Sequence, residues 1–213
     1  RAVLTTGDMI SAQRADTLQR EELLTKTRLI QSGIPSGNLQ KLNGSEADLV
    51  SPDYLAVKEE LIRVRHADPQ IRFSYVLGQR SDKTLFFIID SEPPWSEDYS
   101  APGDPYPEAS ATLLEVFLSG DEITEGPLTD RWGTWVSGIV PITDATTGTV
   151  IAVIGTDIDA RDWNMQILIA CGPAIIGTLL LILLVLIFFY VLDRNEREMK
   201  AREESEAVVR ESE

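Results

Sequence analysis

Two tryptophans lie three residues apart in the segment TDRWGTWVSGIVPI, residues 129–142. Side chains alternate between the two faces of an extended strand, so a strand that is regular through both residues would place Trp132 and Trp135 on opposite faces. One indole would then pack in a core, and the other would line a pocket. The alternative is that both indoles are structural and pack in the core or under loops.

A carboxylate follows in the next strand-like run, VIAVIGTDID, residues 150–159. Alternation predicts that Asp157 shares a face with Val153 and Gly155. A buried charge is costly unless it is paired, so the Asp157 carboxylate needs hydrogen-bond donors or a cation. It could accept backbone hydrogen bonds from the proline-rich loop, residues 92–108, or it could bind a polar or cationic group of a ligand.

That loop and the strand before it supply three further candidates, Asp90, Tyr99 and Tyr106. Loops that cover a sheet commonly carry binding residues, although turn formation and loop packing are the alternative roles for each one. Aromatic walls with a carboxylate suit a small cationic or hydrogen-bond-donating ligand. The predicted ligand site therefore contains Asp157, Trp132 or Trp135, Tyr99, Tyr106 and Asp90.

Other kinds of chemistry find little support in the residue pattern. The sequence has no Gly-x-Ser-x-Gly, no Ser/His/Asp arrangement and no Cys/His metal-ligand spacing, so we predict no catalytic residues, no metal and no cofactor. An ectoenzyme is the less favoured alternative. The 213 residues carry a formal net charge of −15, which would repel nucleic-acid phosphates. The single cysteine, Cys171, excludes an internal disulfide.

The elements that must position these residues can be predicted from local patterns. Residues 1–34 indicate a helix that ends at Gly33 and Pro35, and a second helix begins at Ser51-Pro52-Asp53. Period-two alternation and turn residues predict strands over 72–79, 84–90, 125–130, 132–142 and 149–159, with a short helix over 109–120. Short connections favour antiparallel pairing, so we predict an α+β domain over residues 35–160, with helices on a sheet of about five strands.

An uncharged apolar run, ILIACGPAIIGTLLLILLVLIFFYVL, covers residues 167–192. Roughly 20 such residues cross a bilayer as a helix, so residues 161–192 are predicted to be a transmembrane helix with an interfacial flank, in contact with membrane lipid. Trp163 and Tyr190 lie where aromatic anchors are expected. A buried core helix is the alternative.

The charges on either side of this run predict its orientation. Arg194, Arg197, Lys200 and Arg202 follow it, whereas only Arg161 closely precedes it. The positive-inside rule therefore places residues 193–213 in the cytoplasm and residues 1–166 outside. The tail has the composition of a helix, with opposite charges at three- and four-residue spacing.

The order of elements resembles the single Cache (PDC, PAS-like) sensor domain of bacterial and archaeal receptors. The residues that carry this resemblance are TDRWGTWVSGIVPITDATTGTVIAVIGTDID, which is similar to the closing hairpin of that family, and SEDYSAPGDPYPEAS, which is similar to its loop-to-helix segment. The tail, which ends in RESE, resembles the linker helix of sensor histidine kinases. The resemblance therefore implies the extracytoplasmic sensor of a histidine kinase, or alternatively of a diguanylate cyclase or chemoreceptor.

The resemblance also carries expectations about the site and the assembly. In relatives that bind amino acids or amines, the Asp in the Gly-x-Asp-Ile context contacts the ligand amine, and Asp157 matches that position. The family's Arg and Trp-Tyr motif has no clear counterpart, because the loop around Trp95 and Tyr99 lacks the arginine, which leaves an amino-acid ligand in doubt. Signalling through a single span needs a second copy, so we expect a parallel homodimer. A ligand-free dimerising anchor is the alternative.

Overall fold

The computed structural model describes the backbone of residues 6–211, and the side-chain surroundings of residues 11–200 apart from positions 171 and 174. Residues 13–167 form one compact unit, and the chain on either side of it forms a second. The elements are α1 (Thr6–Ser32), α2 (Ser36–Leu39), the 3-10 helix η1 (Glu46–Val50), α3 (Pro52–Ala67), β1 (Phe73–Gln79), β2 (Leu85–Asp90), α4 (Ala111–Ser119), β3 (Ile123–Thr129), β4 (Thr134–Thr143), β5 (Val150–Asp159) and α5 (Ala160–Glu211).

The predicted α+β fold is confirmed. The five strands form one sheet in the order β2-β1-β5-β4-β3, and all neighbours are antiparallel. Residues of the β4–β5 turn stabilise that hairpin. The Asp144 carboxylate accepts the backbone N–H of Thr146 and Thr147, and Gly148 has a φ of 71°. The central pairing of β1 with β5 joins segments that are distant in sequence.

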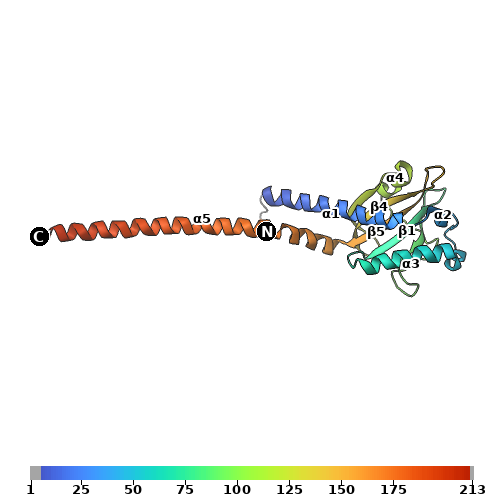
Figure 1. Cartoon of the computed structure of the whole chain (residues 1–213), viewed down its shortest axis with the longest axis horizontal. Helices are drawn as coiled ribbons and strands as arrows, with labels where there is room; N and C mark the ends of the chain where they lie inside the picture. Colours follow the sequence, from blue (N-terminus) through green and yellow to red (C-terminus); the bar gives the residue numbers. More distant parts are fainter. Residues whose placement is uncertain (1–5, 212–213) are drawn as a thin grey trace. The chain divides into compact units, whose positions relative to one another are not determined.

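One face of the sheet is covered by α1 and α3 (Figure 1). Ile30 of α1 and Leu61 of α3 pack there against strand residues that include Ile154. Helix α1 lies very close to β4, because a Cβ on Gly138 would be 2.8 Å from both the Leu23 Cγ and the Thr27 Oγ1. A side chain at position 138 would therefore push the helix away from the sheet.

The opposite face carries α4 and an aromatic core (Figure 1). Ser110 caps α4 by accepting the N–H of Leu113 at 2.9 Å, and Gly120 ends it in the left-handed conformation with a φ of 74°. Leu113 and Val116 of this short helix are buried against the sheet. This face also holds the side chains of the candidate ligand site.

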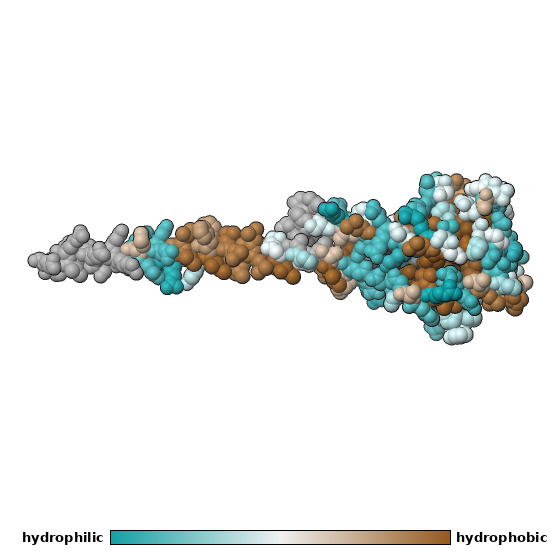
Figure 2. Space-filling model, viewed as in Figure 1, coloured by the Kyte–Doolittle hydropathy of each residue, from teal (hydrophilic) through white to brown (hydrophobic). Residues whose placement is uncertain are grey.

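The second unit contains most of α5, a continuous helix from Ala160 to Glu211. Among the described residues, this is the one helix that is long and apolar enough to cross a membrane, with a mean hydropathy of 3.1 over its most apolar window. Its apolar side chains form a continuous band along the face of the helix that Figure 2 shows, and residues from Leu179 to Leu192 are exposed. These features agree with the predicted span over residues 167–192.

One detail of the prediction is different in the structure. Trp163 is not an interfacial anchor: only 2% of it is exposed, and its indole N–H donates to the Asp16 carboxylate of α1 at 2.9 Å. The predicted N-terminal helix is observed from Thr6 to Ser32, while residues 1–5 lie outside the described part of the chain, as do residues 212–213 of the predicted linker helix.

Candidate functional site

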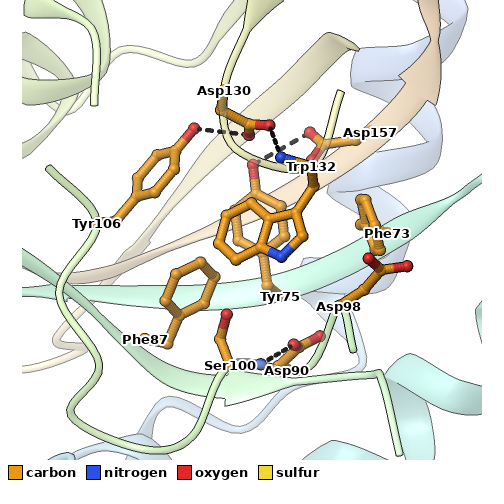
Figure 3. Close-up of a pocket in the computed structure, with 10 residues that line it drawn as sticks. All are labelled: Phe73, Tyr75, Phe87, Asp90, Asp98, Ser100, Tyr106, Asp130, Trp132 and Asp157. Atoms are coloured by element: carbon orange, nitrogen blue, oxygen red, sulfur yellow. Dashed lines mark hydrogen bonds between the residues drawn. The ribbon is translucent and has the colours of Figure 1, made fainter. Parts of the chain in front are cut away.

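A recess lies on the α4 side of the sheet, between β1, β2, β5 and the loop that follows β2 (Figure 3). It encloses about 310 Å³, including space that is open to solvent. Its lining consists of aromatic rings, carboxylates and one serine: Phe73, Tyr75, Phe87, Tyr106, Trp132, Asp90, Asp98, Asp130, Asp157 and Ser100.

The position of Asp157 is determined by two strand residues, Tyr75 and Gly155. Register pairs Tyr75 on β1 with Gly155 on β5, and the Tyr75 ring lies directly over this glycine, where a Cβ would be 2.3 Å from the ring. The Tyr75 hydroxyl therefore reaches Asp157, two residues further along β5, and donates to its Oδ1 at 3.1 Å. The Gly-x-Asp spacing thus has a physical purpose, because the glycine makes room for the ring that supports the carboxylate.

Burial dominates the electrostatics of Asp157, which is only 4% exposed. Burial raises the pKa of its carboxyl group from 3.8 to about 7, although hydrogen bonds from Ser137 and Tyr75 oppose this rise. The negative charges of Asp130 and Glu125 raise the pKa further. Burial and the neighbouring Asp157 charge also raise the pKa of the Tyr75 phenol, so this hydroxyl remains a proton donor. A ligand cation beside Asp157 would favour its charged form.

Asp90 holds the proline-rich loop by accepting backbone hydrogen bonds from it, which was one of the two roles considered for Asp157. It is 4% exposed, and its carboxylate accepts the backbone N–H of Glu92 at 3.0 Å and of Ser100 at 2.8 Å. These bonds hold both ends of the loop segment from Glu92 to Ser100. Burial raises the pKa of Asp90 to about 6, and the two backbone bonds oppose that rise.

The prediction that Trp132 and Trp135 point to opposite faces is wrong. Strand β4 begins at Thr134, so Trp132 lies in the preceding turn, where alternation does not apply. Asp130 organises this turn: its Oδ1 accepts the backbone N–H of Trp132 and the indole N–H of Trp135, each at 2.9 Å. Both indoles therefore belong to the same aromatic cluster on the α4 side.

The two tryptophans nevertheless have different surroundings. Trp135 is 7% exposed and packs edge-on against Phe73, with ring centroids 5.0 Å apart, so it is a core residue beside the recess. Trp132 is half-buried and lines the recess itself. It stacks on Tyr106 at 6.3 Å and meets Phe87 edge-on at 5.8 Å.

The loop tyrosines are also separated by the structure. Tyr106 lines the recess, and its hydroxyl donates to the Asp130 Oδ2 at 3.4 Å. Residues around it extend the sheet, since the Tyr106 N–H bonds to the Leu85 carbonyl oxygen of β2. Tyr99 is not part of the recess lining; its ring instead faces the Lys58 ammonium of α3 at 4.8 Å.

The structure thus brings together four of the six predicted residues, Asp157, Asp90, Trp132 and Tyr106, and places Trp135 and Tyr99 outside the lining. The sequence interpretation missed the floor of the recess, which includes Phe73, Tyr75 and Phe87, and the carboxylates of Asp98 and Asp130. Alternation within RFSYVLGQ and TLFFIID would have placed the floor residues on one face. No local signal indicates that β1 pairs with β5.

No cationic side chain is among the residues that line the recess. Arg72 lies at its edge and pairs with Asp98 at 2.5 Å and with the buried Glu92 at 2.6 Å. Asp90 and Asp157 have no such partner among the ion pairs of the described residues. The described part of the chain also contains no group of three His, Cys, Asp or Glu residues suited to a metal ion. Among the carboxylates of the lining, Asp98 is thus paired with Arg72, Asp90 and Asp130 accept N–H groups of the chain, and Asp157 is bonded by hydroxyl groups.

No protein-family model matches the chain, and no curated protein matches its sequence. Solved structures are similar to it at low identity. An extracellular ligand-binding receptor from Desulfohalobium retbaense matches with 8% identity and a TM-score of 0.48, over 79% of this chain and 28% of that chain. The ligand-binding domain of the Campylobacter jejuni chemoreceptor Tlp3, in complex with 4-methylisoleucine, matches with 15% identity and a TM-score of 0.35, over 76% of this chain and 64% of that chain.

The periplasmic sensory domain of the C. jejuni chemoreceptor Tlp1 also matches, with 11% identity and a TM-score of 0.43, over 74% of this chain and 59% of that chain. The chain is thus structurally similar, at low identity, to extracellular and periplasmic sensory domains of receptors. It spans less than two thirds of the length of these three structures, and the similarity assigns neither a ligand nor an effector to it.

Proposed function

We propose that this chain is the sensor and membrane-spanning part of a signal-transduction receptor, and that the recess on the α4 side binds a small cationic molecule. The observation that supports this most is Asp157, a buried carboxylate that faces an aromatic recess with only hydroxyl donors as partners. Aromatic faces and carboxylates together favour organic cations over anions or apolar molecules. The role we propose for the described residues is binding and not catalysis.

The ligand test uses the whole chain in lipid nanodiscs. Small amines, amino acids, carboxylates and sugars are screened for an increase in melting temperature, followed by tryptophan fluorescence, because a ligand that binds only the folded state stabilises it. We expect stabilisation by at least one cationic compound, and its loss in Asp157→Asn. If no compound of any class binds, the ligand-free dimerising anchor becomes the better interpretation.

We further propose that residues 1–166 are extracytoplasmic and that residues 193–213 are cytoplasmic, where the chain leads into a histidine kinase. The supporting observations are the arginines and lysine that follow the span and the resemblance of the tail to kinase linker helices. A diguanylate cyclase or chemoreceptor is the alternative effector. An assay of the full-length protein for ATP-dependent autophosphorylation on histidine, with diguanylate cyclase activity as the second readout, distinguishes these effector classes.

The mechanism we propose is a ligand-dependent shift between two arrangements of a parallel homodimer that contacts through α1. Helix α1 leaves Leu18 and Leu29 exposed, at 58% and 68%, while Leu23 and Thr27 are buried against the sheet. Single cysteines in a Cys171→Ala background test this. Cysteines at positions 18 and 29 are expected to cross-link in membranes, and cysteines at 23 and 27 are not. Equal cross-linking at all four positions would contradict a dimer through the exposed face.

A further inference from the structure

A larger hollow lies directly outside the candidate ligand site. This outer hollow encloses about 790 Å³, including space that is open to solvent, and its lining includes Thr134 of β4 and Arg161 in the first turn of α5. The recess itself has room for about one water molecule. A larger molecule can therefore reach Asp157 only if the boundary between the two spaces moves.

Three side chains, Phe73, Asp98 and Trp132, line both spaces and form this boundary (Figure 3). Phe73 belongs to the inner strand β1, whose backbone is paired with β2 and β5. Trp132 is held by its backbone bond to Asp130 and by stacking on Tyr106. Asp98 is the member of the boundary that lies on the loop after β2, so it is the side chain that can leave without disturbing the sheet.

The loop segment that carries Asp98, residues 92–100, is not bonded to the sheet through its backbone. Its backbone–backbone hydrogen bonds, donated by Ser96 and Tyr99, are accepted within the same segment. Further along the chain, the Gly103 N–H bonds to a carbonyl oxygen of β2, so the sheet holds the loop again from there. Residues 92–100 can therefore move while the ladder of the sheet remains intact.

An ion pair holds Asp98 in place. Its Oδ2 accepts the Arg72 guanidinium at 2.5 Å, and the Arg72 and Asp98 side chains are 41% and 35% exposed. Ion pairs as exposed as this contribute little to stability and are screened by salt. Arg72 also bonds to the Glu92 carboxylate at 2.6 Å, and it keeps that partner when Asp98 leaves. Separation of the pair therefore leaves neither charge buried without a partner.

We propose that the Arg72–Asp98 ion pair is a gate between the outer hollow and the recess, and that its separation lets Asp98 move outward and opens a path to Asp157. This inference concerns access to the recess, so it goes beyond the proposed function and does not depend on what the recess binds.

The accessibility of a thiol inside the recess tests the gate in the whole chain in nanodiscs, in the Cys171→Ala background. Ser100→Cys places that thiol, because Ser100 lines the recess and is 4% exposed. The probe is methyl methanethiosulfonate, a small neutral reagent whose approach does not depend on the charge of the gate. Asp98→Asn should raise the reaction rate at position 100 about twofold to fivefold, the factor that corresponds to an exposed ion pair. High salt should raise the rate when Asp98 is present and leave it unchanged in Asp98→Asn.

Glu97→Gln is the matched control, because it removes the same charge from an exposed neighbour on the loop, and it should leave the rate at position 100 unchanged. Ser74→Cys, used in place of Ser100→Cys, reports unfolding of the domain, because Ser74 is fully buried and alternates with the recess residues of β1. An unchanged rate at position 100 in Asp98→Asn, an equal rise in Glu97→Gln, or parallel rises at positions 74 and 100 would each overturn the gate, while leaving the proposed class of ligand intact.

Discussion

Replacement of Asp157 by asparagine should stabilise the folded chain above neutral pH, although it removes a proposed ligand contact. The folded-state pKa of Asp157 is about 7, above its ordinary value of 3.8, because the carboxyl group is buried. The folded state therefore holds this proton more tightly than the unfolded state does. The unfolding free energy therefore falls as the pH rises from about 4 to about 7. Above about pH 7 it stays at the lower value.

The size of this cost follows from the two pKa values. The difference between 3.8 and about 7 corresponds to about 4 kcal/mol of unfolding free energy, at about 1.36 kcal/mol for each pKa unit. Asparagine is neutral at every pH, and its amide oxygen can still accept the Tyr75 hydroxyl. The variant should match the wild type near pH 4 and exceed it by up to about 4 kcal/mol at pH 8.

Urea unfolding of the detergent-solubilised chain, followed by tryptophan fluorescence between pH 4 and pH 8, measures this difference. Asp121→Asn serves as the control because Asp121 is exposed, and its curve should run parallel to that of the wild type. Asp90 is present in both chains, so the contribution of its raised pKa to the pH dependence of unfolding is the same in each and cancels in the difference. A constant difference between wild type and Asp157→Asn across this pH range, or a less stable variant at pH 8, would refute the assignment of Asp157 as an uncompensated buried acid.

Three further outcomes are expected. Gly155→Ala should destabilise the fold by about 1–3 kcal/mol, since the new methyl group would meet the Tyr75 ring; unchanged thermal unfolding would show that the ring does not depend on this glycine. Trp135→Ala should cost about 3–5 kcal/mol because it removes a buried ring, whereas Trp132→Ala should cost less and mainly weaken ligand binding; the reverse order in denaturant titrations would contradict their placement. A reporter fused after Glu213 should be active only in the cytoplasm, and activity on the other side would reject the proposed orientation.

Helices and strands could be predicted from the sequence wherever residues within the element itself indicate it. Proline at the start of α3 and alternation in the β4–β5 hairpin predicted these elements to within about two residues. The same alternation placed Asp157 with Gly155 on one face, which the structure bears out through the pairing of both residues with β1. These are cases in which backbone preference and burial pattern agree.

The remaining features depend on contacts that neighbouring residues do not encode. Tyr75 supports Asp157 only because β1 pairs with β5, a pairing between distant segments. The error over the two tryptophans has a local cause, since the Asp130 side chain forms a turn that delays the start of β4 and removes Trp132 from the alternating pattern. Likewise, Asp157 lies beside Ser137 only through the register of β5 with β4.

Strand β5 ends at Asp159 and α5 begins at Ala160, so no connecting residues lie between the strand that carries Asp157 and the helix that contains the candidate span. An α-helix turns by about 100° per residue, which means that one residue added or deleted after Ala160 would rotate everything that follows by that angle. If the chain is the sensor proposed above, its recombination with another output module would therefore succeed only at junctions that preserve helical phase. Working chimaeras should recur at spacings of about seven residues, which complete about two turns.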